Sequence, residues 1–303
     1  MEPQKVVLVM GNGFDLDLGF KTKYSDFAKS KEWQEMYAKH ANESSHFSLL
    51  NYLNDKKDVD KWFDIEQSLL DYAHIKTKDV WMHDVENDKH EYHIICECLS
   101  QYLKEHVNNS SQNIDKTCAA QVLRCFQRDS ELRKIYTFNY TPLSLIERVL
   151  CKLHPVPFVH VHGSVEANNI ILGIETIEPG TILPKYDFLF KTSNPSYQHT
   201  LLQYDMNDAD EVILFGHSMN MIDAVFFEDY LQGLTKPCEK NRHLTIITYD
   251  IASRQSILHN IRQMGIPVPK LFSYAQLEFI LTNNMDQEMQ KRFKKLLERS
   301  EIY

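Results

Sequence analysis

Small and polar residues follow several short apolar runs of this sequence, each at the point where the run ends. After the first run, at 5–10, come Gly11, Asn12, Gly13, Phe14 and Asp15. Glycines let a backbone approach a phosphate closely, and a helix that begins there attracts anions. The spacing G-N-G-x5-G, completed by Gly19, differs from the dinucleotide fingerprint G-x-G-x-x-G. The loop predicts a phosphate site, and the alternative is a turn with only a structural role. If it binds phosphate, a bulky residue at Gly13 is expected to block binding without unfolding the chain.

Asn139 and His162 follow two further apolar runs, Ile135–Phe138 and Val156–Val161. Open α/β sheets bind ligands at the carboxyl ends of their strands, which is where both residues are expected. An amide offers a donor and an acceptor, and an imidazole can take a proton near neutral pH. We predict that the two side chains face one cavity with the glycine loop. The alternatives are that Asn139 caps a helix beginning at Pro142 and that His162 only makes a turn.

Two later apolar runs, at 212–215 and 244–248, also end in residues suited to nucleotide binding. Gly216 would allow close backbone approach, Ser218 could donate to a ribose or phosphate, and Asp250 could accept from ribose hydroxyls. Asp15 either binds ribose or caps its turn. His160 is expected to be a packed core histidine.

The apolar runs predict strands at 5–10, 135–138, 156–161, 170–172, 212–215 and 244–248. Helical patterns lie between most of them, at 142–153, 186–206, 224–231 and 252–264, and a helix opening near Thr22 uses that residue as its cap. This alternation predicts an α/β, Rossmann-like fold with a largely parallel sheet.

Residues 41–130 hold no convincing strand and read as an all-helical insertion between the first and second strands. The expected domains are a nucleotide-binding core at 1–40 and 131–272, the insertion at 41–130, and C-terminal helices at 273–303. The polar stretch His83–His93 is expected to be a solvated loop, not a metal site.

Composition narrows the function classes. The net charge of −9 argues against a nucleic-acid-binding protein. No apolar run is long enough to span a bilayer, and the amino terminus has no basic start or cleavage site, so a cytoplasmic protein is expected. The six cysteines form no Cys-x-x-Cys, so no metal is expected.

Taken in order, the motifs GNGFDLDLGFKTKYSDF, WFDIEQ, TFNYT, HVHGS and LFGHSMNMID resemble the AbiH family of bacterial abortive-infection proteins. More distantly, the series is similar to the sirtuins, whose glycines, Asn, catalytic His and G-T-S motif match Gly11, Gly13, Gly19, Asn139, His162, Gly216 and Ser218. The sequence departs from sirtuins at Lys21–Tyr24 and Thr141, and the sirtuin zinc module is missing. Zinc-free, sirtuin-like defence proteins that hydrolyse NAD are therefore the better analogy.

The resemblance implies an antiphage effector that hydrolyses NAD to nicotinamide and ADP-ribose in a sirtuin-like pocket. Thr22, Tyr24 and Thr141, although they lie where the sequence departs from sirtuins, are expected among the binding residues. The alternatives are a non-catalytic sensor of NAD or ADP-ribose and a nucleic-acid-targeting toxin. A homo-oligomer or a phage-derived trigger is the expected macromolecular partner, and no membrane is expected.

Overall fold

A computed structural model describes residues 5–41, 48–59, 64–78, 84–108, 114–128, 132–142, 144, 146, 156–175, 181–198, 200–237, 242–283 and 285–298. Its contacts divide the chain into two compact units. The sheet unit is Met1–Phe20, Ser111–Val161 and His199–Tyr303, and the helical unit is Lys21–Ser110 and His162–Gln198. These units differ from the domain limits expected from the sequence, which stay a prediction.

The sheet unit contains one six-stranded sheet in the order β3-β2-β1-β4-β5-β6. Its strands are β1 (Val6–Met10), β2 (Leu132–Thr137), β3 (Phe158–His160), β4 (Glu211–Phe215), β5 (His243–Thr248) and β6 (Leu277–Leu281). Every neighbouring pair is parallel. Strands β1 and β4 are buried along their whole length, as expected for apolar runs covered on both faces. The predicted Rossmann-like fold is confirmed.

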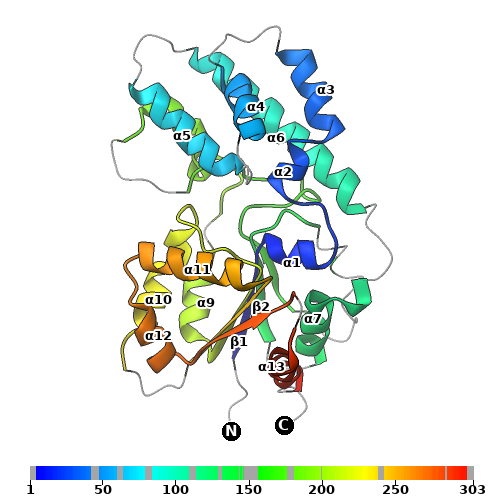
Figure 1. Ribbon diagram of the computed structural model, residues 1–303. Helices are drawn as coiled ribbons and strands as arrows, with labels where there is room; N and C mark the ends of the chain where they lie inside the picture. The colour runs from blue at the N-terminus through cyan, green and yellow to red at the C-terminus, as the bar shows by residue number, and fades with distance from the viewer. Residues whose placement is uncertain are drawn as a thin grey trace. The chain divides into compact units, whose positions relative to one another are not determined.

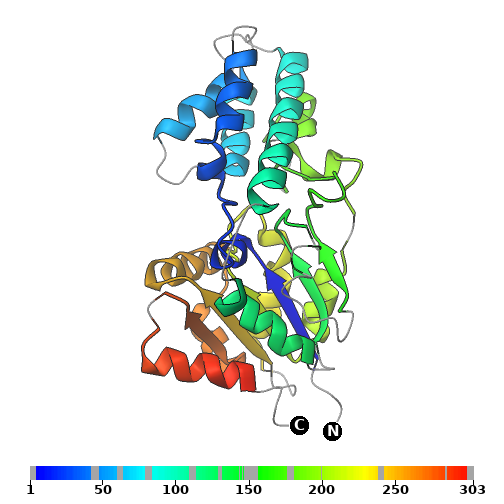
Figure 2. The same cartoon turned by 90° about the vertical axis from the view of Figure 1, so that its right-hand side faces the viewer.

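Helices cover both faces of this sheet (Figure 1). One face packs on α9 (Leu202–Asp208), α10 (Glu228–Leu234), α11 (Ile251–Gln263) and α12 (Val268–Tyr274), with the turn η4 (Ala224–Phe226) before α10. On the other side, α1 (Asn12–Asp17) contacts α7 (Cys118–Arg128), and α7 contacts α13 (Gln287–Glu298); η1 (Ile114–Lys116) precedes α7. Figure 2 shows α7 and α13 side by side. Alternate residues of the central strands face each layer, which fixes the register of the sheet.

The helical unit is built from α2 (Tyr24–Phe27), α3 (Lys31–His40), α4 (Leu49–Val59), α5 (Ile65–Lys78) and α6 (Val85–Asn108), with the 3-10 turns η2 (Pro184–Leu189) and η3 (Lys191–Ser193). Helix α6 packs on α3 and α4, and η2 packs on α5 and α6. The described residues between β1 and β2 contain helices and no strand, so the predicted helical insertion is confirmed. None of the described helices is long and apolar enough to cross a membrane.

Several predicted elements are wrong. Residues 170–172 form no strand, and Leu277–Leu281, expected among C-terminal helices, forms β6. The helix expected at 186–206 is two 3-10 turns followed by α9, because Pro195 interrupts the helical pattern. Lys23, not Thr22, occupies the cap position of α2. Most of the helix expected at 142–153 lies outside the described residues.

The stretch predicted as a solvated loop at 83–93 belongs largely to α6, although His83 lies outside the described residues. Asp88 and Glu91 of this helix are buried. Asp88 accepts hydrogen bonds from the hydroxyls of Tyr72 (2.6 Å) and Tyr186 (2.9 Å), and Glu91 accepts from the backbone N–H of Leu50 (2.8 Å). Buried carboxylates need such partners, so this acidic stretch holds the helical unit together.

Candidate functional site

The strand order places a topological switch point between β1 and β4, because the chain winds away from this pair in both directions. Ligands of open α/β sheets bind outside the carboxyl ends of the strands at such a point. The loop after β1 and the loop after β4 meet there. Gly11 N–H donates to Phe215 O (2.9 Å), and Gly13 N–H donates to Gly216 O (2.8 Å).

The glycines are required by this loop-to-loop packing. A Cβ at Gly11 would lie 2.6 Å from His217 Cα, and a Cβ at Gly13 would lie 2.6 Å from Gly216 Cα. Gly216 has a φ of +66°, a left-handed conformation that favours glycine. A bulky residue at Gly13 would collide with this backbone, so one of the two loops would have to shift, and loss of binding without unfolding stays a prediction.

The hydrogen bonds within and between these two loops already use backbone N–H groups that a phosphate would need. Besides the N–H groups of Gly11 and Gly13, the N–H of Phe14 donates to Gly11 O (2.9 Å). The Phe14 side chain is fully buried and packs edge-to-face on Phe215 with ring centroids 5.2 Å apart. Phe14 is therefore a core residue, and phosphate binding by this loop stays a prediction.

Asn139 lies just past β2 and is held by two acceptors. Its Nδ2 donates to Gly11 O (3.0 Å) and to Asp15 Oδ1 (2.8 Å), so both amide hydrogens are used. Thr141 Oγ1 donates to the second Asp15 oxygen, and all three polar residues are buried. Among the described residues nothing donates to Asn139 Oδ1. Asn139 can therefore offer a ligand an acceptor but not a donor, whereas its residue type alone allowed both.

The Asp15 carboxyl is the titratable group of this cluster. Burial raises its pKa from 3.8 to about 7, and the hydrogen bonds from Thr141 and Asn139 oppose that rise only in part. Its proton is thus exchanged in the physiological range. This follows from placing a carboxylate in the core with neutral donors and no cation.

His217 and Asp223 form a second buried pair at the turn after β4. His217 Nδ1 accepts from the backbone N–H of Met219 (2.9 Å), so its proton is on Nε2, which lies 3.5 Å from Asp223 Oδ2. The ring packs on Phe138 at 4.4 Å and Phe227 at 4.8 Å between centroids. The pair fixes the shape of the turn that contacts the glycine loop.

His162 belongs to the helical unit and lies in a buried cluster of charged groups. Lys191 Nζ lies 3.2 Å from His162 Nδ1 and 3.1 Å from Glu66 Oε1. Glu175 Oε2 lies 3.7 Å from His162 Nε2, and the Tyr197 hydroxyl donates to the Glu175 carboxylate. Lys191 is completely buried.

Lys191 Nζ lies at nearly the same distance from both ring nitrogens of His162, 3.2 Å from Nδ1 and 3.3 Å from Nε2. An ammonium can only donate, so Lys191 can donate to whichever ring nitrogen carries a lone pair. The ring thus lies between an ammonium and the Glu175 carboxylate, whose effects on a positive charge at His162 oppose each other.

The remaining predicted site residues fall into different roles. Asp250 caps α11, because its Oδ1 accepts from the Ser253 N–H at 2.8 Å; this bond lowers the Asp250 pKa. Ser218 is exposed, and its carbonyl accepts from Asn260 Nδ2 (3.0 Å). Asn12 is exposed at the start of α1, and Thr22 and Tyr24 are half-buried in the helical unit.

His160 is half-buried, not packed in the core as expected, because β3 is the edge strand of the sheet. Its Nδ1 lies 3.1 Å from the carbonyl of Asn139.

Sequence reasoning missed the partners of His162 and the His217–Asp223 pair. Lys191 and Glu175 were not singled out, and Glu66 had no role. A lysine in the apolar segment 186–191 was the available signal, since buried lysines need acidic partners. Among the described residues, no three His, Cys, Asp or Glu side chains gather as a metal site would require.

Comparison with known proteins decides the family. The model of the bacteriophage abortive infection family AbiH matches residues 7–247, which include the glycine loop, Asn139, His162 and Gly216. The chain belongs to the AbiH family. No curated protein matches the chain.

This AbiH-family chain is also similar to solved Sir2 structures. A Sir2 homologue mutant with ADP-ribose is 14% identical, with a TM-score of 0.43 and coverage of 100% of this chain and 95% of that one. A second Sir2 homologue mutant, with 2'-O-acetyl ADP-ribose, is 15% identical, with a TM-score of 0.42 and coverage of 99% and 93%. A Sir2 bound to a propionylated peptide is 12% identical, with a TM-score of 0.41 and coverage of 100% and 95%. The fold assignment rests on the strand order described above.

Proposed function

We propose that this AbiH-family chain is an abortive-infection effector that hydrolyses NAD to nicotinamide and ADP-ribose, with Asn139 and His162 as its catalytic residues. The observation that carries the proposal is the buried Asn139 amide at the carboxyl end of β2. Its two hydrogens are bound by Gly11 and Asp15, and its oxygen is left as an acceptor beside the switch point of a Rossmann-like sheet.

The reaction needs positioning more than acid catalysis. The bond between nicotinamide and ribose breaks through an oxocarbenium-like state, and nicotinamide leaves as a neutral molecule from a cationic ring. The enzyme must fix the ribose and place a water near the anomeric carbon. Asn139 Oδ1 would accept a hydrogen bond from that water or from a ribose hydroxyl. Gly11 and Asp15 would hold the amide in this orientation.

His162 would take the proton released when water adds. The Glu175 carboxylate, 3.7 Å from His162 Nε2, supports that role, because it would stabilise a protonated imidazole. Burial raises the pKa of Asp15 to about 7, so this neighbour of Asn139 can change its charge near neutral pH. Contacts to the dinucleotide would come from Asn12 and Ser218, which are both exposed at the switch point.

The experiment is release of nicotinamide from NAD by the purified chain, with and without extract of phage-infected cells as a source of trigger. Asn139→Ala and His162→Ala should each lower the rate by on the order of 10²–10⁴. The matched control is His259→Ala, which removes an exposed histidine of α11 and should leave the rate unchanged.

Two outcomes would replace this proposal. NAD that binds and is recovered intact under both conditions would assign the chain as a sensor of NAD or ADP-ribose. Cleavage of added DNA or RNA with NAD untouched would assign it as a nucleic-acid-targeting toxin.

A further inference from the structure

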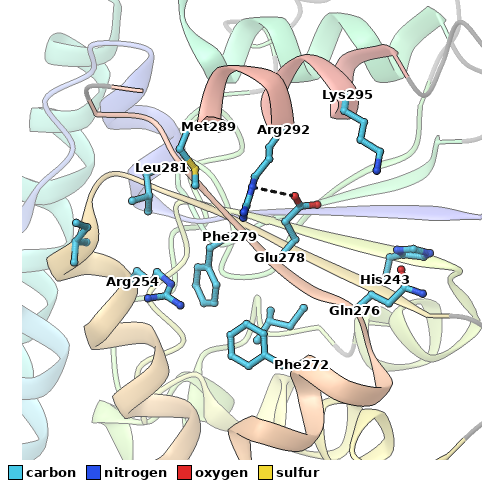
Figure 3. A pocket seen from close by; sticks show the side chains of 12 residues that line it. His243, Arg254, Phe272, Gln276, Glu278, Phe279, Leu281, Met289, Arg292 and Lys295 are labelled. Carbon is cyan, nitrogen blue, oxygen red and sulfur yellow. Dashed lines mark ion pairs between the residues drawn. The ribbon is translucent and has the colours of Figure 1, made fainter. Parts of the chain in front are cut away.

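A groove of about 760 Å³ runs along the outer edge of the sheet, over strand β6 (Figure 3). Strand β6 is the last in the sheet order, so only β5 pairs with it in the described part of the chain. Helices α11 and α12 border the groove on one side and α13 borders it on the other. All of these elements belong to the sheet unit.

The edge strand presents its backbone to this groove. Thr282 N–H donates to Thr248 O (2.9 Å), and Thr248 lies opposite Leu281 in the parallel ladder. Bonds to a parallel neighbour repeat at every second residue, so Glu278 and Ile280 bond to β5, and the N–H and C=O groups of Phe279 and Leu281 point away from it. Such groups are a template to which an extended peptide can add as a strand.

The walls of the groove carry an excess of positive charge. Arg254, Arg292 and Lys295 line it together with a single carboxylate, Glu278, whose Oε1 lies 3.9 Å from Arg292 Nε. Arg292 also pairs with Glu288 of α13, which does not line the groove, so Arg254 and Lys295 supply most of the excess charge. The Arg254 guanidinium lies over the Phe279 ring, 4.9 Å from its centroid. This concentration of cations occurs in a chain with a net charge of −9, so the groove differs in sign from the protein as a whole.

Apolar side chains lie between these cations. Phe272 of α12 is 44% exposed, and Met289 of α13 is half-buried (Figure 3). Successive side chains of an added strand would point alternately to the α12 side and to the α13 side. Each side offers an apolar surface next to a cation, which suits an extended segment that combines acidic and apolar residues.

We propose that β6 accepts an extended, acidic segment of a partner protein as an additional strand of the sheet. The cations also argue against a second copy of this chain as the occupant, because pairing two β6 edges would bring the same positive charges together. The proposal does not depend on NAD hydrolysis.

The test uses the purified full chain and a fluorescent peptide of about eight residues that alternates Glu and Val, read by fluorescence anisotropy. A peptide that alternates Lys and Val is the control probe. Saturable binding of the acidic peptide alone is expected. Arg292→Glu should weaken it by on the order of tenfold, whereas Lys291→Glu, at an exposed position of α13 outside the groove, should change it by less than about twofold.

A second variant separates strand addition from simple charge attraction. Leu281→Pro removes an outward N–H, and proline is tolerated on edge strands where the N–H does not bond to the neighbouring strand. Leu281→Ala, which keeps that N–H, is the matched control. Strand addition predicts weaker binding by Leu281→Pro than by Leu281→Ala, with similar melting temperatures of the two variants. Equal binding of both peptides, equal effects of the two α13 variants, or equal binding by the two Leu281 variants would overturn the proposal. So would dimerisation of the parent chain that is lost in Arg292→Glu.

Discussion

Replacing Asp15 by Asn should remove a pH-dependent component of stability. Burial raises the Asp15 pKa from 3.8 to about 7, so the native state holds this proton more tightly than the unfolded chain does. Below about pH 4 both states are protonated. As the pH rises from there to about 7, the unfolded chain releases the proton first and the native state loses stability. At about 1.4 kcal/mol for each pH unit, the loss between pH 5 and pH 8 is roughly 3 kcal/mol.

The substitution keeps the size of the side chain and cannot titrate. Asn at position 15 can still accept from Asn139 and can donate to the Thr141 oxygen, so the cluster should stay folded. The assay is urea unfolding followed by circular dichroism at pH 5 and pH 8, for the parent and for Asp15→Asn. The difference in unfolding free energy between the two proteins should change by roughly 3 kcal/mol in favour of Asn at pH 8. Parallel pH profiles would refute the reasoning, because Asp15 would then titrate alike in both states.

The other predictions concern buried charge and backbone contact. Lys191→Met should destabilise the helical unit by about 3–5 kcal/mol in urea unfolding, because it leaves buried carboxylates without their ammonium; adding Glu66→Gln should recover part of this loss, and full additivity of the two changes would contradict the pairing. Gly13→Ala should lower the melting temperature, since its Cβ would meet Gly216 Cα at 2.6 Å, whereas Gly233→Ala in α10, whose nearest atom is 3.9 Å away, should not. Equal melting of these two variants would show that the loops can move apart.

Much of the sheet could be predicted because its central strands are short, continuous apolar runs. Val6–Met10 and Glu211–Phe215 are buried throughout, and polar residues end each run. Leu277–Leu281 was missed because a short apolar run fits a strand and a buried helix equally well. The segment is a strand because it pairs with β5. That pairing joins segments distant in the sequence, so the local sequence does not predict it. The helix expected at 186–206 fails at Pro195, where local chemistry outweighs apolar spacing.

Part of the candidate site could likewise be predicted from the sequence, and part could not. Asn139 lies at a strand end, as its place after an apolar run predicts, and Asp250 shows the capping role that strand-end acids also have. The hydrogen bonds of Asn139 to Gly11 and Asp15 join segments far apart in the sequence, so the commitment of both amide hydrogens could not be predicted. The same holds for the ammonium of Lys191 beside His162, which depends on tertiary packing and not on any motif.

The measurement that tests the central claim most directly is the fate of NAD incubated with the purified chain in water enriched in oxygen-18, alongside extract of phage-infected cells. Hydrolysis predicts equal amounts of nicotinamide and ADP-ribose, with the heavy oxygen at the ribose carbon that carried nicotinamide, and loss of both products in Asn139→Ala and His162→Ala. NAD that binds the chain and is recovered without heavy oxygen or free nicotinamide would contradict the account.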